Sequence, residues 1–249
     1  MNSGPSTTTE AILLSAARIS TFDGQQPLTG ASGFFFERED RLFLVTSRHV
    51  FIDEPSKHFP DRIEIELHTD PDNLTQSIGL SMLLYREGRS VWRDGKDSGG
   101  DIDVAVLEID RAALPERCVL QAFTPAHLPA AEGEHIEVGD ALLIVGFPLG
   151  FHDLLHHLPV VRQAVIASSY GMRFQGKGYF LTDARTHRGT SGAPVLMRDT
   201  SPSAAVQGLP WKLLGVHSSR MDIAGRDQLQ DEALGLNCAW YADILLTLT

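Results

Sequence analysis

The chain has 249 residues, of which 43% are hydrophobic, and its formal net charge is -11 at pH 7. This length and apolar content allow a substantial core, in one globular unit or in two small units that share a cleft. The sequence has no run of lysine and arginine that could follow a phosphate backbone, which argues against a nucleic-acid partner. Its longest apolar runs have the length of strands and fall short of the roughly 20 residues of a membrane-spanning helix, so we expect no membrane role.

The first ten residues are polar and lack the basic and apolar regions of a secretory signal, so we expect residues 1–10 to form a flexible tail. Cys118 and Cys238 are too few for a disulfide framework and are expected to be packing residues. These features predict a reducing, cytoplasmic setting, unless a signal has been removed from the chain.

Short apolar segments separated by turns predict strands throughout residues 11–110. The alternation of apolar and polar residues is clearest over 62–68, which is typical of a half-buried antiparallel strand. The polar, glycine-rich residues 93–100 are predicted to form a loop. The expected strands are 11–21, 33–37, 42–45, 62–68, 78–85 and 104–109.

Residues 111–137 contain three prolines and no sustained periodicity, so they are interpreted as a connector. Residues 138–249 supply a second set of strands and end in a segment, 241–249, that is expected to form a short helix packed on that set. Many short strands with few helical patterns indicate an all-β pair of units. The expected strands are 141–147, 160–168, 179–182, 194–197, 212–218 and 235–240.

Three residues in these elements are candidates for nucleophilic catalysis. Ser191 lies between Gly189 and Gly192 and before an apolar run, a pattern that predicts a sharp turn but is weak evidence by itself. His49 ends an apolar run, and Asp103 directly precedes another. A serine hydroxyl needs an imidazole to take its proton, and the imidazole needs a carboxylate to fix its tautomer.

The segments around these residues resemble the His, Asp and Ser boxes of the trypsin-like serine proteases, most closely the bacterial branch of Deg/HtrA-type and glutamyl endopeptidase-type enzymes. Segments 30–34, 138–150 and 213–218 resemble further parts of the family, so the similarity spans nearly the whole chain. It implies two antiparallel six-stranded β-barrels, over residues 11–110 and 138–249, with a short C-terminal helix. The three boxes are Val45-Thr-Ser-Arg-His-Val50, Asp103-Val-Ala-Val-Leu107 and Thr182-Asp-Ala-Arg-Thr-His-Arg-Gly-Thr-Ser-Gly-Ala-Pro194.

The resemblance implies a serine endopeptidase that acts on protein or peptide substrates without a metal or cofactor. His49 would be the general base, Asp103 would orient it and Ser191 would form the acyl-enzyme. Asp101 is the rival carboxylate, and Asp103 is preferred because the family places the acid directly before Val-Ala-Val-Leu. The backbone N–H groups of Gly189 and Ser191 would form the oxyanion hole.

The chain departs from the family at Thr190, where relatives have Asp or Asn, and at Ala193, where many have Gly. Both residues are small, so we expect activity to survive. An oxyanion hole that is ordered only by substrate or by an activating partner, whose identity is unknown, is the open alternative.

The residues just before Ser191 and the strand over residues 215–220 are expected to form the walls of the specificity pocket. Thr186 and His217 match the threonine and histidine with which glutamyl endopeptidases hold a glutamate carboxylate, so we favour cleavage after Glu or Asp. Relatives without this preference also carry polar residues here, so the preference is open. The substrate-binding candidates are Arg185, Thr186, His217, Ser218 and Arg220.

Two alternatives use the same cleft. A catalytically silent member of the fold would only hold a peptide, and an esterase would act on small acyl esters. A separate histidine cluster, His152, His156 and His157, invites a metal hypothesis, but no Cys or paired carboxylate completes a site nearby in the sequence. We interpret that cluster as a solvated surface loop and expect no metal.

Overall fold

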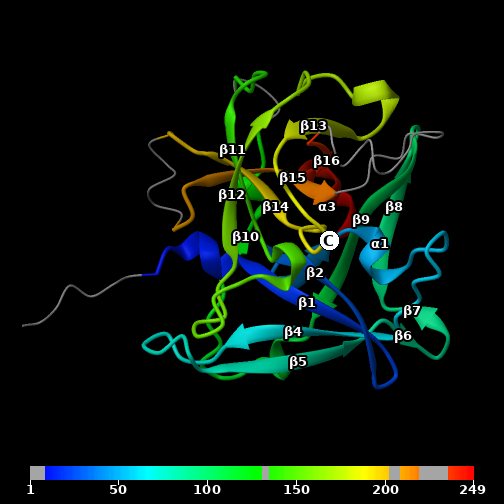
Figure 1. Cartoon of the computed structure of the whole chain (residues 1–249), viewed down its shortest axis with the longest axis vertical. Helices are drawn as coiled ribbons and strands as arrows, with labels where there is room; N and C mark the ends of the chain where they lie inside the picture. The colour runs from blue at the N-terminus through cyan, green and yellow to red at the C-terminus, as the bar shows by residue number, and fades with distance from the viewer. Residues whose placement is uncertain (1–8, 131–134, 202–207, 219–234) are drawn as a thin grey trace, which may run out of the picture.

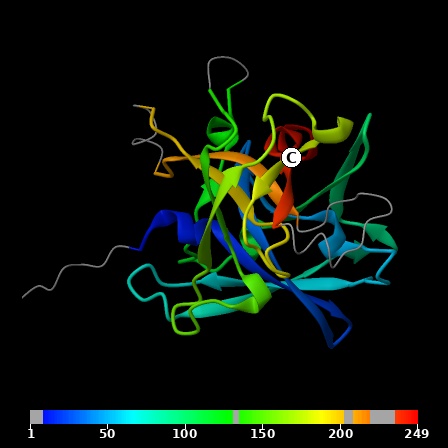
Figure 2. The ribbon, with the colours of Figure 1, turned by 45° about the horizontal axis from the view of Figure 1, so that its top comes forward.

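The computed structural model describes residues 9–130, 135–201, 208–218 and 235–249. The described chain is almost entirely β, with a large sheet built from the first half and a closed barrel built from the second (Figure 1). In both views the strands β4 and β5 of the sheet lie below the barrel strands (Figures 1 and 2). The predicted all-β class is confirmed, whereas the predicted boundaries at residues 110 and 137 stay predictions.

The first half forms an eight-stranded sheet, in which seven strands follow the order β5-β4-β1-β2-β3-β9-β8 and β10 pairs with β2. Side chains of β4 alternate between half-buried and buried along most of its length, as its sequence pattern predicts. A separate hairpin is formed by β6 (Tyr85–Arg86) and β7 (Arg89–Ser90). The strands of the sheet are β1 (Ala16–Asp23), β2 (Gln26–Arg38), β3 (Arg41–Thr46), β4 (Arg62–His68), β5 (Ser77–Leu83), β8 (Trp92–Asp97), β9 (Gly100–Ile109) and β10 (Ala122–Phe123).

The second half forms a closed barrel in the order β11-β12-β13-β16-β15-β14, which confirms the six-stranded barrel expected there. Closure pairs the edges of its strands with one another, so the barrel leaves no open sheet edge. Its strands are β11 (Ala141–Gly146), β12 (Val160–Ile166), β13 (Tyr179–Asp183), β14 (Pro194–Arg198), β15 (Trp211–Ser218) and β16 (Leu236–Tyr241).

Two segments of the first half differ from their prediction. Ala11–Ser15 forms a 3-10 helix instead of the start of a strand, closed by a hydrogen bond from the Ser15 hydroxyl to the Ile12 carbonyl. Residues 93–100 were expected to be a loop, but most of them belong to β8, which pairs with β9. Most side chains of this edge strand are exposed or half-buried, so no apolar alternation marks it in the sequence.

Helices are short. The predicted C-terminal helix is present as α3 (Leu245–Leu248), but it packs against β8 and β9 of the sheet, not only on the barrel. The Arg93 side chain of β8 donates a 3.0 Å hydrogen bond to the Leu248 carbonyl. The remaining described helices are α1 (Arg48–Phe51) and 3-10 turns at Arg111–Ala113, Pro125–His127, Pro148–Gly150, Phe174–Gly176 and Ala242–Ile244.

The largest apolar cluster is built from both halves of the chain. Phe34, Val45 and Val104 of the sheet pack in it with Val145 and Val216 of the barrel, all of them at most 1% exposed. Two further clusters belong to the sheet alone and to the barrel alone. The shared cluster therefore fixes how the two halves meet. Cys238 lies in this shared cluster, and Cys118 is a half-buried free thiol.

Truncation of the shared cluster should destabilise the whole protein. Phe34 is fully buried and meets the Phe123 ring edge-on, so Phe34→Ala should lower the free energy of unfolding by about 3–5 kcal/mol. Phe59 is 53% exposed, so Phe59→Ala should change it by less than about 0.5 kcal/mol. Urea denaturation measures both values, and equal effects of the two variants would contradict the assignment of this core.

Candidate active site

His49 and Asp103 come from neighbouring elements of the sheet. The buried strand β3 ends at Thr46, and the short helix α1 that follows carries His49, while Asp103 lies on β9 beside it. The Nδ1 atom of His49 is 2.7 Å from Oδ2 of Asp103, and the backbone N–H of His49 donates to Oδ1 at 2.9 Å. One carboxylate therefore holds both the ring and the backbone of the same histidine.

The Asp103 carboxylate is held in its ionised form. Burial raises the pKa of Asp103, but the charge and hydrogen bonds of His49 and a hydrogen bond from Ser218 outweigh it, so the pKa lies below its usual value. The Ser218 hydroxyl donates to Oδ2 at 2.9 Å, which places this predicted substrate-binding residue on the carboxylate. The rival Asp101 is exposed and forms an ion pair with Lys96.

Ser191 lies in a turn that packs tightly against the sheet. Its backbone carbonyl accepts a 3.0 Å hydrogen bond from the Ser32 N–H of β2. The next residue, Gly192, has φ of 86°, and a Cβ atom there would lie 2.2 Å from both Ser32 O and Thr46 Oγ1. Because only glycine fits both the conformation and the space, Gly192 allows Ser191 to approach the end of β3.

The His217 carbonyl joins the Ser191 turn to the segment that leads to His49. It accepts a 2.8 Å hydrogen bond from the Gly192 N–H and a 3.2 Å hydrogen bond from the Ser47 hydroxyl. The residue after Ser191 and the residue two before His49 are thus bound to the same oxygen atom. The structure therefore brings the segments of Ser191 and His49, one from each half of the chain, to the same junction.

The turn before Ser191 is fixed from behind by residues 147–150. The Arg188 carbonyl accepts a hydrogen bond from the Leu149 N–H at 2.6 Å, and the Gly189 carbonyl accepts one from the Ser32 hydroxyl at 2.7 Å. In a trans peptide the C=O and the next N–H point in opposite directions, so the Gly189 N–H points away from Leu149. Gly189 has φ of 90°, and a Cβ atom there would lie 2.7 Å from the Phe147 carbonyl oxygen.

His217 places a buried imidazole beside this junction. His217 is fully buried, and within the described chain neither nitrogen of its ring has a hydrogen-bond partner. Burial, with a smaller contribution from the charge of His49, lowers the pKa of His217 to about 3. The ring is therefore neutral at pH 7 and leaves one N–H donor unpaired, which costs about 1–3 kcal/mol.

The other predicted pocket residues that the structure describes are not buried side chains without a partner, unlike His217. The Thr186 hydroxyl donates a 2.8 Å hydrogen bond to Oδ1 of Asn237, a residue that sequence reasoning missed. Arg185 is exposed, and its backbone carbonyl binds the Arg162 guanidinium. Arg220 lies outside the described residues. No sequence motif marked Asn237, because its contact with Thr186 joins positions 51 residues apart.

The comparison with protein-family models identifies the family. Residues 31–201 match the model described as a trypsin-like peptidase domain. The chain belongs to this family. It is therefore a trypsin-like serine protease, built on the sheet and barrel described above. A comparison with curated protein sequences found no match.

Solved structures share this fold. The scabies mite inactivated protease paralogue S-I1 is similar over 96% of this chain and 95% of its own, with a TM-score of 0.54 and 19% identity. The serine endoprotease from Yersinia pestis is similar over 98% of this chain and 65% of its own, with a TM-score of 0.52 and 16% identity. Among the described residues, no helix has both the length and the apolar character needed to cross a membrane.

Burial of a neutral His217 predicts a pH dependence of stability. A histidine in the unfolded chain has a pKa near 6.5, so between this value and about 3 the unfolded chain binds a proton that the folded protein does not. The free energy of unfolding should therefore fall by about 1.4 kcal/mol for each pH unit through this one group as the pH is lowered from about 6 to 4.5.

His217→Val should remove that contribution, whereas the carboxylates and the other histidines titrate in both proteins. Urea denaturation at several pH values measures the two slopes. A variant whose unfolding free energy depends on pH as steeply as that of the wild type would contradict the neutral, buried state of His217.

Proposed function

We propose that this protease is an endopeptidase that cleaves peptide bonds through Ser191, His49 and Asp103. The 2.7 Å contact between His49 Nδ1 and the ionised Asp103 carboxylate is the observation that carries the proposal. That contact leaves Nε2 of His49 as the ring atom that can take a proton. Ser191 supplies the hydroxyl. Its neighbour Gly192 donates to the His217 carbonyl, which also accepts from Ser47, two residues before His49.

The reaction follows from these positions. His49 takes the proton of the Ser191 hydroxyl as its oxygen attacks the substrate carbonyl, and then gives that proton to the leaving amine. Asp103 keeps the proton of His49 on Nδ1 and stabilises the imidazolium, and Ser218 positions the carboxylate. Water then attacks the acyl-Ser191 ester by the same steps in reverse order and releases the second product.

The N–H groups of Gly189 and Ser191 are proposed to bind the oxyanion. The hydrogen bond between Arg188 and Leu149 supports this assignment, because it turns the Gly189 N–H away from residues 147–150. Thr190 and Ala193, the two departures from the family pattern, are both buried at the turn. The Ala193 N–H donates to the Thr190 carbonyl at 3.0 Å, so both residues stabilise the turn through its backbone.

We further propose a preference for Glu or Asp before the cleaved bond, as in glutamyl endopeptidase-type relatives. His217 supports it, because a buried donor that has no partner in the described part of the chain gains one when a substrate carboxylate arrives. The carboxylate would also raise the pKa of His217 and favour its charged form. Thr186 can contribute only if its hydroxyl exchanges Asn237 for the substrate.

The silent peptide-binding alternative has a precedent in the fold. One similar structure is described as an inactivated protease paralogue, so the fold alone does not establish catalysis. What favours catalysis in this chain is the retained pair of His49 and Asp103 beside the Ser191 turn. A silent binding module would need neither the short hydrogen bond nor the ionised, buried carboxylate.

Replacement of Asp103 tests the catalytic proposal. Asp103→Asn should lower kcat by about 10⁴-fold, because the amide favours the wrong tautomer of His49. Asp101→Asn is the matched control, since Asp101 is exposed and lies two residues away on the same strand, and it should change kcat less than about threefold. Hydrolysis of a peptide library, followed through new amino termini, measures both. Similar rates for Asp103→Asn and the wild type would contradict the proposal.

The specificity proposal predicts a Glu-dominated cleavage profile. His217→Val should lower kcat/KM for a Glu substrate by about 10²-fold and for the matched Gln substrate by clearly less, because a hydrogen bond to a charged carboxylate is stronger than one to a neutral amide. His187→Ala is the control, because His187 is an exposed histidine in the turn before Ser191. A wild-type profile dominated by aliphatic residues, or equal losses for Glu and Gln, would remove His217 from substrate recognition.

A further inference from the structure

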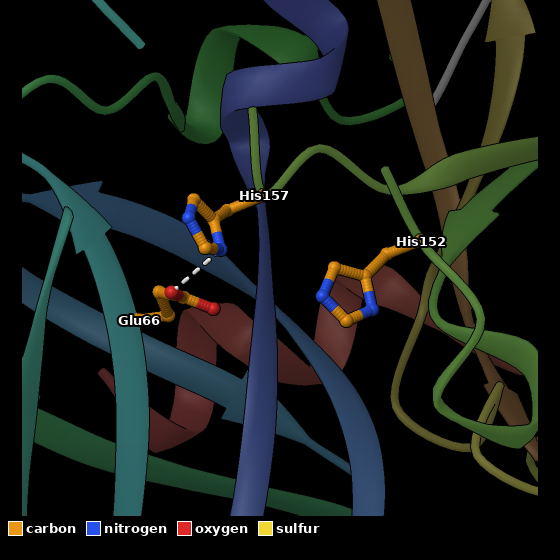
Figure 3. Close-up of side chains that lie close together, drawn as sticks. All are labelled: Glu66, His152 and His157. Atoms are coloured by element: carbon orange, nitrogen blue, oxygen red, sulfur yellow. Dashed lines mark ion pairs between the residues drawn. The ribbon is translucent and has the colours of Figure 1, made fainter. Parts of the chain in front are cut away.

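A cluster of Glu66, His152 and His157 lies at the contact between the two halves of the chain (Figure 3). Glu66 comes from β4 of the sheet, and the two histidines come from the connection between β11 and β12 of the barrel. One ligand atom from each residue lies within 4.8 Å of the other two. Sequence reasoning found no Cys or paired carboxylate to complete a site with these histidines, and Glu66 belongs to the other half of the chain.

The Glu66 carboxylate is ionised and held in place. Its Oε2 atom binds the Arg18 guanidinium at 3.0 Å, and its Oε1 atom accepts from the Ser77 hydroxyl at 2.8 Å. Burial raises the pKa of Glu66, but these hydrogen bonds and the charges of Arg18 and His157 lower it below its usual value. Oε1 is also 2.8 Å from Nδ1 of His157, so this oxygen faces the histidines.

The His152 ring is oriented for coordination. Its Nδ1 is 2.6 Å from the Gly150 carbonyl, so Nδ1 carries the hydrogen and Nε2 keeps its lone pair. Figure 3 shows the ring turned toward His157 and Glu66. A backbone carbonyl that fixes the tautomer of a histidine in this way is the usual support of a metal ligand.

We propose that Glu66, His152 and His157 bind one divalent transition-metal ion, with zinc the best fit. Two imidazoles and one carboxylate suit zinc and leave a fourth position for water, whereas calcium and magnesium prefer oxygen ligands alone. The ion takes Oε1 of Glu66, Nε2 of His152 and Nδ1 of His157. Nδ1 of His157 must present its lone pair to the ion, so a neutral ring carries its hydrogen on Nε2 instead, whereas a protonated ring releases the Nδ1 proton to solvent.

The ligands must adjust slightly around the ion. Zinc bonds of 2.0–2.2 Å in a tetrahedral site place ligand atoms about 3.4 Å apart. Oε1 of Glu66 and Nδ1 of His157, which are 2.8 Å apart, must separate by about 0.6 Å, and the ligand atom of His152, within 4.8 Å of both, must approach by at most about 1.4 Å. Both histidines lie in a connection without regular strands or helices apart from the 3-10 turn Pro148–Gly150, which allows this shift. Next to Glu66 and His157 lies a small cavity of about 10 Å³, enough for one water molecule.

Bound metal would tie the barrel to the sheet. The ion would add a second link between β4 and the connection from β11 to β12. The first link is His68 of β4, whose Nε2 lies 2.6 Å from the His156 carbonyl. The same connection holds the Arg188 carbonyl through the Leu149 N–H. The metal therefore stabilises the folded protein and braces the support of the Ser191 turn. This inference is independent of the proposed catalytic mechanism.

The test is zinc binding by metal-free protein. Isothermal titration with zinc chloride should show one saturable site per chain, and the melting temperature should rise by about 5 °C or more at free zinc about 100 times Kd. Magnesium and calcium chloride should do neither. Glu66→Gln, His152→Ala and His157→Ala should each weaken binding by about 10-fold or more. Ser191→Ala should bind zinc as the wild type does, whether or not the proposed mechanism holds.

His156→Ala is the matched control, because His156 lies on the same connection but pairs with Asp153 instead of Glu66. It should bind zinc with unchanged affinity. Circular dichroism without metal shows which variants are folded. His152→Ala removes one hydrogen bond to a backbone carbonyl and the ring contacts with Phe147 and His157 but no ion pair, so the test survives if Glu66→Gln does not fold. No saturable binding by the wild type, or an equal loss in His156→Ala and His152→Ala, would overturn the proposal.

Discussion

Apolar side chains from the sheet and the barrel pack into one buried cluster, and the position of every candidate catalytic residue depends on that contact. Phe34 of β2 pairs with Val45 near the end of β3, from which the chain continues to His49, and Val104 follows Asp103 directly. Val216 precedes His217 on the barrel side. Because close-packed interiors transmit small shifts, this cluster sets the separation of the two halves of the site.

Buried polar contacts turn that approximate placement into a defined geometry. The Ser32 hydroxyl donates to the Gly189 carbonyl and accepts from the Phe147 N–H, and the His217 carbonyl accepts from both halves. These groups satisfy one another within a region from which water is excluded, where an unpaired group is costly. His217 breaks this pattern, because neither of its ring nitrogens has a partner among the described residues, and such a local cost is expected where a ligand completes the site.

The sequence predicted those features whose chemistry is local. The alternation in β4, the glycines around Ser191 and the residue types at His49 and Asp103 each follow from a few neighbouring positions. The features it missed depend on distant partners. Ser32 meets Gly189, Asn237 meets Thr186 and Glu66 meets His157 across separations that no spacing rule encodes. Ser218 was assigned to the substrate because its strand lines the cleft, yet its hydroxyl faces Asp103.

The account rests on activation of a barrel serine by a histidine from the sheet. The most direct measurement is the rate at which a fluorophosphonate labels the protein, with the adduct located by mass spectrometry of its peptides. We predict an adduct on Ser191 and a labelling rate that falls by about 10²-fold or more in folded His49→Ala. An adduct on another residue, or an unchanged rate at Ser191 without the imidazole of His49, would contradict the account.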